Sequence, residues 1–122
     1  MELVFSCSLS CFLAIFSGRA TMFDHPTRDP WNTMGRISHL ACVAHRKLPT
    51  ERIKKLIEMG LIVAHKKIPC YTLVQVCVNR TQLCSEAVVA DWGPVHADID
   101  LYAPLSKKLK HNGDERATWF IK

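Results

Sequence analysis

The sequence predicts a small α+β domain, in which a three-stranded antiparallel sheet is covered by a C-terminal helix and stabilised by disulfides. Three strand-like segments follow one another with connections of roughly 3–5 residues, which are too short for a parallel crossover. A helix predicted to begin at Pro94 is the element available to cover the apolar face of that sheet. With 122 residues, the chain allows one domain at most.

The composition is that of a folded, basic protein. Apolar residues make up 48% and charged residues 22%, which is typical of a globular rather than a disordered chain. The formal net charge of +5 and a pI near 9.0 indicate an anionic partner. Nucleic acid, an acidic membrane surface and a sulfated polysaccharide all remain open on charge alone.

Residues 1–20 differ from the rest and predict a secretory signal peptide. Residues 3–16 form a largely apolar run without charge, shorter than the roughly 20 residues of a membrane-spanning helix. Gly18-Arg19-Ala20 supplies the small-x-small pattern of a cleavage site. Glu2 before the run departs from the usual basic start, and a buried N-terminal helix or strand is the alternative. We expect a secreted, extracellular protein with no stable membrane insertion.

Residues 21–41 show no periodicity and are broken by Pro26, Pro30 and Gly35, so we expect a flexible N-terminal arm. A helix is predicted over residues 51–59, where Thr50 can cap the N-terminus and Gly60 stands at the C-terminus. The apolar residues that share one face of this helix are Ile53, Leu56 and Ile57.

Three strands follow this helix. Residues 61–65 are rich in β-branched side chains, and residues 70–78 alternate so that every second valine lies on one face. "QLCSEAVV" is the third candidate, although a helix could also begin at Ser85. Pro94 suits a first helical position, with Val95, Ile99 and Tyr102 at helical spacing. Trp92 is the expected core anchor, and residues 105–122 are expected to form a basic C-terminal tail.

Cleavage after Ala20 would leave four cysteines in the mature chain, which is typical of a small secreted disulfide framework with three possible pairings. These cysteines are Cys42, Cys70, Cys77 and Cys84. The triplet beginning at Asn79 is an N-glycosylation acceptor in an exported protein.

Two histidines, His39 and His45, flank Cys42, and this pattern could indicate a catalytic thiol or a metal ligand. A nucleophilic thiol needs a base held by a third group, and nothing in the sequence indicates one. Structural zinc sites use closely spaced cysteine pairs that this chain lacks. Phosphate-binding and nucleophile-elbow motifs are absent from the sequence. We therefore expect no enzyme and no cofactor.

Basic clusters are more informative. "SKKLKH" (106–111) has the pattern of sulfated-polysaccharide contacts, and three shorter clusters, "HRK", "RIKK" and "HKK", add to it. Nucleic-acid binding is disfavoured because no aromatic residue stands among these charges.

Two segments carry a resemblance to a known family. "CVAHRKLPTERIKK" (42–55) resembles the stretch after the N-terminal cysteines of chemokines, and "CYTLVQVCVNRTQLC" (70–84), followed by Trp92, resembles their second and third strands. The chain is similar to a CC-, XC- or CX-like variant with a single N-terminal cysteine, and residues 42–104 would form the chemokine-like domain.

The resemblance implies a secreted cytokine that binds a seven-helix G-protein-coupled receptor and glycosaminoglycans to direct cell migration, with a homodimer left open. It pairs Cys42 with Cys84, or alternatively with Cys70. The implied receptor contacts are Arg36, Ile37, Ser38, His39, Leu40, Ala41, Val43, His45, Arg46 and Lys47. The implied glycosaminoglycan contacts are Lys66, Lys67, Lys107, Lys108 and Lys110. The alternative function is an intracellular basic module, for example a viral one, that binds nucleic acid or zinc through reduced Cys and His residues.

Overall fold

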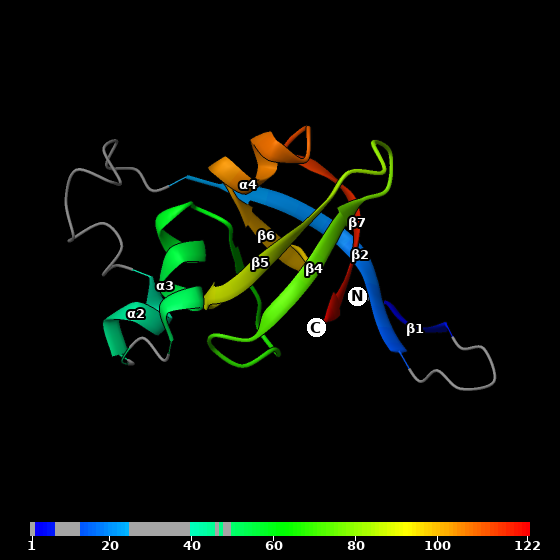
Figure 1. Ribbon diagram of the computed structural model, residues 1–122. Helices are drawn as coiled ribbons and strands as arrows, with labels where there is room; N and C mark the ends of the chain where they lie inside the picture. The colour runs from blue at the N-terminus through cyan, green and yellow to red at the C-terminus, as the bar shows by residue number, and fades with distance from the viewer. Residues whose placement is uncertain (1, 7–12, 25–39, 46, 48–49) are drawn as a thin grey trace.

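The computed structural model describes residues 2–6, 13–24, 40–45, 47 and 50–122, and these form a closed β-barrel (Figure 1). Six strands follow one another around it, and the last one pairs with the first. In spatial order they are β2 (Leu13–Phe23), β6 (Ile99–Tyr102), β3 (Ile62–Ala64), β5 (Cys84–Asp91), β4 (Leu73–Val78) and β7 (Asp114–Ile121).

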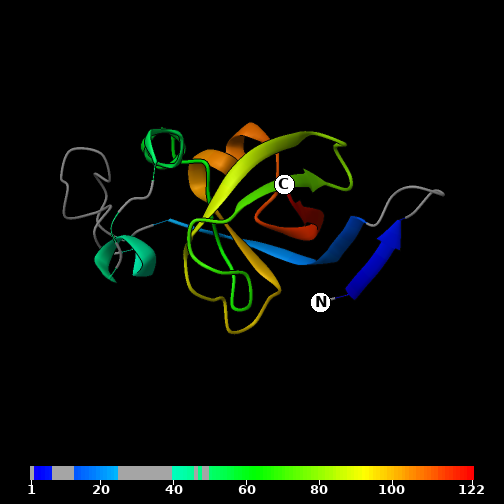
Figure 2. The same cartoon turned by 60° about the horizontal axis from the view of Figure 1, so that its bottom comes forward.

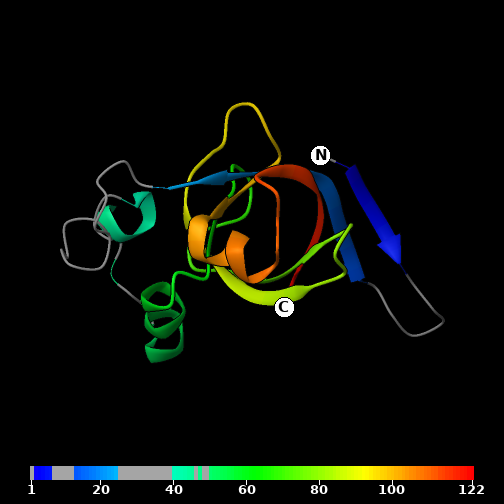
Figure 3. The ribbon, with the colours of Figure 1, turned by 90° about the horizontal axis from the view of Figure 1, so that it is seen from above.

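The barrel is mixed, because β2 runs parallel to β6 and β3 runs parallel to β5, whereas the other neighbours are antiparallel. A further strand, β1 (Glu2–Ser6), pairs with β2 and extends it outside the barrel. Seen from above, β1 lies at the opposite side of the barrel from helices α2 (Ala41–His45) and α3 (Glu51–Glu58) (Figure 3).

Helix α3 confirms the predicted helix and its cap. The Thr50 hydroxyl accepts a hydrogen bond from the Ile53 N–H at 3.2 Å, and Gly60 follows the helix at a φ of 76°. The three apolar residues of its predicted face are buried, and the helix packs against β5. The predicted strands also form, as β3, β4 and β5.

The predicted three-stranded sheet is nevertheless wrong, because three of the barrel strands, β2, β6 and β7, lie in segments that were predicted to be a signal peptide and arm, a helix and a tail. Residues 105–122, expected as a tail, contribute to helix α4 (Ala103–Lys108) and supply β7. Trp119 of β7 is fully buried at the centre of the core, whereas the expected anchor, Trp92, is 64% exposed. The outward side chains in the first part of β7, Asp114, Arg116 and Thr118, are charged or polar, and this surface character hid an alternating strand.

The helix expected from Pro94 does not form. Residues 99–102 are strand β6, in which Ile99 and Leu101 point into the barrel with no exposed surface, while Val95 is 70% exposed. A helix begins only at Ala103, and Pro104 stands in its first turn. Three residues at helical spacing were too few to separate a helix from a short strand.

Strand β2 occupies residues that were expected to be a signal peptide and the start of an arm. Residues 16–21 pair with β7 and residues 20–23 pair with β6, so β2 closes the barrel. Ala20, the expected cleavage position, has no exposed surface. Cleavage after Ala20 would remove most of β2, so a molecule cleaved there cannot contain this strand. Signal-peptide cleavage stays a prediction. Residues 25–39 of the expected arm lie outside the described residues.

In the part of the chain that the structure describes, none of the helices has the length and apolar character needed to span a bilayer.

Candidate functional site

Backbone register aligns four residues from neighbouring strands on the outside of the barrel. Thr21 of β2 is the partner of Asp100 on β6, and Asp100 is the partner of Ala64 on β3. Ala64 is in turn the partner of Asp91 on β5, beside a register shift in β3. Partners in a sheet project their side chains to one face. We call this line of residues (Thr21, Asp100, Ala64 and Asp91) the polar row.

Asp100 lies near the middle of the polar row and is half-buried. The Thr21 hydroxyl donates a hydrogen bond to its Oδ1 at 2.9 Å. Burial raises the pKa of the Asp100 carboxyl, and the charge of Asp91 raises it further, against the opposing effects of Thr21 and His111. Asp100 therefore holds a proton more readily than an ordinary aspartate does.

Asp91 ends the polar row and is fixed by the backbone around it. Its Oδ1 accepts hydrogen bonds from the backbone N–H of Ala41 and of Trp92, each at 2.9 Å. Ala41 is the first residue of α2, and the Tyr71 hydroxyl donates to the carbonyl of the next residue, Cys42, at 3.1 Å. Helix α2 is therefore attached to the barrel beside the polar row.

Trp92 follows directly after the polar row and carries the largest exposed aromatic surface among the described residues. An exposed tryptophan next to an aspartate in the chain brings an apolar ring and hydrogen-bonding groups into one region of the surface, which is the usual mixture in small-ligand sites. Sequence reasoning missed this site, because it treated Trp92 as core and passed over Asp91 and Asp100. The alternation around Asp100, with a buried apolar residue on each side, was the available signal.

The predicted glycosaminoglycan contacts do not form one surface. Lys66 and Lys67 lie after β3, beside Asp98, which precedes β6. The other three lysines are exposed on and after α4, which follows the far end of β6. Because β3 and β6 are antiparallel, these two groups lie at opposite ends of the strand pair. Figure 2 shows the same separation between α4 and the loop that joins β5 to β6.

Of the predicted receptor contacts that the structure describes, Ala41, Val43 and His45 lie in helix α2 and not in a loop. Leu40 is 2% exposed, and Val43 packs against the core. The Ala41 N–H is bound to Asp91, and Lys47 is exposed. His45 is the last residue of α2. The remaining candidates lie outside the described residues: Arg36, Ile37, Ser38, His39 and Arg46.

All four predicted cysteines form disulfides, which confirms the framework but corrects its pairing. Cys42 bonds to Cys70, the alternative partner, and Cys77 bonds to Cys84. The preferred pairing of Cys42 with Cys84 is wrong because Cys77 and Cys84 are register partners on β4 and β5. Within the described residues no group of three metal-ligating side chains occurs, and the bonded cysteines overturn the alternative of a module with reduced thiols.

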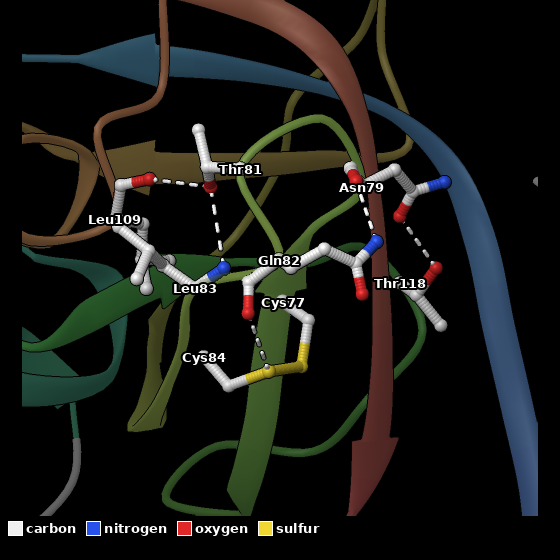
Figure 4. Close-up of a disulfide and its surroundings, with 8 residues drawn as sticks. All are labelled: Cys77, Asn79, Thr81, Gln82, Leu83, Cys84, Leu109 and Thr118. Carbon is white, nitrogen blue, oxygen red and sulfur yellow. Dashed lines mark hydrogen bonds between the residues drawn. A yellow bond between two sulfur atoms is a disulfide. The ribbon is translucent and has the colours of Figure 1, made fainter.

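The predicted glycosylation acceptor lies in the turn between β4 and β5, next to the Cys77–Cys84 disulfide (Figure 4). Asn79 is exposed, and its Oδ1 accepts a hydrogen bond from the Thr118 hydroxyl at 2.8 Å. The Thr81 hydroxyl donates to the carbonyl of Leu109 at 2.9 Å. Glycosylation at this turn stays a prediction.

Ser106 and His111 resemble a hydroxyl–imidazole pair at 2.9 Å, but both are buried. The second ring nitrogen of His111 hydrogen-bonds to the carbonyl of Ala20 at 3.0 Å. The pair therefore fastens the α4 segment to β2.

No protein-family model matches the chain, and no curated protein matches it. Among solved structures, cerato-platanin 3 from M. perniciosa is similar in fold. The TM-score is 0.57 at 14% sequence identity, and the match covers 88% of this chain and 94% of that one. The fold resembles that of a cerato-platanin. At this identity the likeness concerns the fold alone.

This comparison and the closed barrel overturn the chemokine interpretation, together with its receptor and its role in cell migration. The local matches that suggested it, around Cys42 and over residues 70–84, lie in α2, α3 and the β4–β5 hairpin. Such short segments recur in unrelated folds. Glycosaminoglycan binding, the absence of nucleic-acid binding and a homodimer stay predictions.

Proposed function

We propose that this protein is a secreted, non-catalytic binding protein for a neutral polysaccharide, which lies across the polar row and against Trp92. The observation that carries the proposal is the polar row itself. It places a hydroxyl and two carboxyl groups on one outer face, spread over four strands that are each about 4.8 Å from the next. That spread suits an extended chain better than a compact ligand.

The chemistry of the polar row favours sugar hydroxyls. Carboxylate oxygens accept hydrogen bonds from hydroxyl groups, and the Thr21 hydroxyl can both donate and accept. Ala64, between the two aspartates, is 4% exposed and carries no polar side-chain group, so the hydrogen-bonding groups of the row are those of Thr21, Asp100 and Asp91. Two carboxyl groups repel an anionic chain, so the polar row selects against sulfated and uronate-rich polymers. The exposed ring of Trp92 offers an apolar platform for the C–H face of a sugar.

Export is supported by the two disulfides, because such bonds persist in oxidising compartments and are rare in the cytosol. Extracellular polysaccharides would then be the accessible partners.

The test is a co-sedimentation assay with insoluble neutral polysaccharides and with anionic ones of similar particle size. Trp92→Ala and Asp100→Asn should each weaken binding to the neutral polymer about tenfold, since each removes one contact of roughly 1–3 kcal/mol. Met59→Ala on α3 removes another large exposed apolar side chain and should change nothing. Unchanged binding by both site variants, or a preference for the anionic polymer that requires Asp100, would overturn the proposal.

A second candidate is acid–base cleavage of the bound chain, and the raised pKa of Asp100 beside Asp91 favours it. Two interstrand steps separate these residues, so their Cα atoms lie about 10 Å apart. Carboxyl groups of inverting glycosidases lie about 6.5–9.5 Å apart, which side chains at this spacing can reach. Release of reducing ends from the neutral polymer, lost in Asp100→Asn, would establish catalysis and refute a purely binding role.

A further inference from the structure

The six strands of the closed barrel leave no open edge, but the strand outside the barrel restores one. Each barrel strand pairs with a barrel neighbour on both sides, whereas β1 pairs only with β2. Within the part of the chain that the structure describes, the outer edge of β1 is therefore unpaired over the whole of Glu2–Ser6. We call it the β1 edge. Figure 3 shows β1 as the outermost strand, on the side of the barrel away from α2 and α3.

An unpaired strand edge is a binding surface, because its backbone N–H and C=O groups can pair with another strand. Proteins usually prevent such pairing with lysine, proline or a bulge in the edge strand. The sequence of β1, "ELVFS", contains neither lysine nor proline, and its register with β2 runs without a shift. The three central residues are apolar, and Val4 and Phe5 are of the types that favour strands. The residues of β1 therefore offer none of these protections.

Strand geometry limits how a second copy of the chain can pair with this edge. Successive residues turn their N–H and C=O groups to opposite edges, so residues 3 and 5 face one edge and residues 2, 4 and 6 face the other. An antiparallel copy must therefore match even-numbered residues with even-numbered ones, and odd with odd. Among these registers, only the one that pairs Val4 with its own copy uses every residue of β1. Such a pair has two-fold symmetry, which is the commonest symmetry of homodimers.

The charges of β1 favour the same register. Glu2 is the one charged residue among residues 2–6, and pairing about Val4 places it opposite Ser6 of the second copy. Leu3 then stands opposite Phe5, so apolar residues meet apolar ones and no like charges face each other. Parallel pairing in register would instead place the two copies of Glu2 side by side, which is unfavourable.

We propose that the β1 edge pairs with the β1 edge of a second copy, antiparallel and about a two-fold axis at Val4, to form a homodimer. The pair holds about four to six backbone hydrogen bonds. By itself it buries less than the roughly 1,200–2,000 Å² of stable complexes, so the dimer is weak and reversible, with a dissociation constant in the high-micromolar range. This surface is separate from the polar row, since β1 pairs with residues 13–17 of β2 and Thr21 lies beyond them. It does not depend on the proposed function.

The test is sedimentation equilibrium of the full chain, from micromolar to millimolar concentrations, with opposite charges introduced at the two-fold axis. The natural chain should form a dimer as its concentration rises. Val4→Lys alone and Val4→Glu alone should each weaken dimerisation about tenfold, because like charges then stand opposite each other. An equimolar mixture of the two variants should restore the dimer, since a lysine then faces a glutamate.

The control is Leu83→Lys, which introduces the same charge at an exposed apolar residue in the turn between β4 and β5 and should leave dimerisation unchanged. Circular dichroism melting curves should show a folded barrel in every variant, because β1 lies outside it.

A natural chain that stays monomeric throughout the series overturns the proposal. A dimer that persists in both single variants, or after deletion of residues 1–6, places the interface elsewhere and refutes it. A dimer that is lost in the single variants but not restored in their mixture refutes pairing about Val4. Equal weakening by Leu83→Lys would show a general effect of added charge without a defined edge.

Discussion

The ring of His65 lies edge-on to the ring of Trp119, at an interplanar angle of 71°, and Phe16 completes the cluster by stacking on Trp119 at 12°. These three residues come from β2, the segment after β3, and β7. The imidazole is therefore buried between aromatic rings and the backbone N–H groups of Lys67 and Ile68, which donate to its Nδ1.

Acid should destabilise the protein through His65. Its pKa in the folded protein is about 4, below the ordinary value of about 6.5, so the unfolded chain binds this proton first as the pH falls. The contribution is fully present above about pH 6.5 and is lost as the pH falls toward 4. After allowance for solvent screening, we expect this contribution to the free energy of unfolding to be about 2 kcal/mol.

Urea unfolding of the natural protein and of His65→Gln, at pH 7 and at pH 4.5, measures this contribution. The variant should lose less stability on acidification, and His96→Gln, at an exposed histidine, should behave like the natural protein. Equal losses in all three proteins would show that the ring of His65 is not the source.

Deleting residues 1–20 should abolish folding, because it removes most of β2 and opens the barrel between β6 and β7. Deleting residues 1–6 removes only β1, which pairs outside the barrel, and should lower the melting temperature slightly. Circular dichroism melting curves compare the two proteins. A cooperative transition of unchanged midpoint after the longer deletion would mean that β2 is dispensable and that a signal at this position can be cleaved without loss.

The two disulfides should stabilise the fold unequally. Cys42–Cys70 spans 28 residues and Cys77–Cys84 spans 7, so the chain-entropy relation gives roughly 3.5 and 2.5 kcal/mol. Paired serine variants of each bridge, unfolded in urea, should lose stability in that order. Peptide mapping without reduction should recover both bridges, and a peptide that joins Cys42 to Cys84 would contradict the structure.

Heparin elution should depend on the lysines on and after α4 more than on Lys66 and Lys67. Replacing Lys107, Lys108 and Lys110 by Ala removes three exposed charges, and elution should move to lower salt. Replacing Lys66 and Lys67 by Ala should have a smaller effect, since Asp98 already offsets part of their charge. If the triple variant elutes unchanged, glycosaminoglycan binding no longer has support.

Local signals in the sequence were sufficient for the elements that depend on local interactions. Helix α3 was predicted with its cap at Thr50 because capping and helical periodicity involve residues three or four apart. Strand β4 was predicted because Val74, Val76 and Val78 alternate, and all three are buried. Its hairpin with β5 followed from the short turn between them.

The closure of the barrel could not be predicted in the same way. An uncharged apolar run suits both the core of a signal peptide and a barrel strand, and the end of the run over residues 3–16 overlaps β2. The polar row could not be predicted from the sequence either, because strand register, and not spacing along the chain, brings Asp91, Asp100 and Thr21 together. Only the alternation around Asp100 marked its outward direction.

The position of β2 in the barrel sets a condition on biosynthesis. Its partners lie far along the chain, since Thr21 bonds to Asp100 across 79 residues and Arg19 bonds to Asp114 across 95. A ribosome makes this apolar strand long before it makes either neighbour. Assembly of the barrel therefore waits until residue 121, the last residue of β7, has been made, and shielding of the early strand by a chaperone or a translocation channel would limit aggregation in that interval.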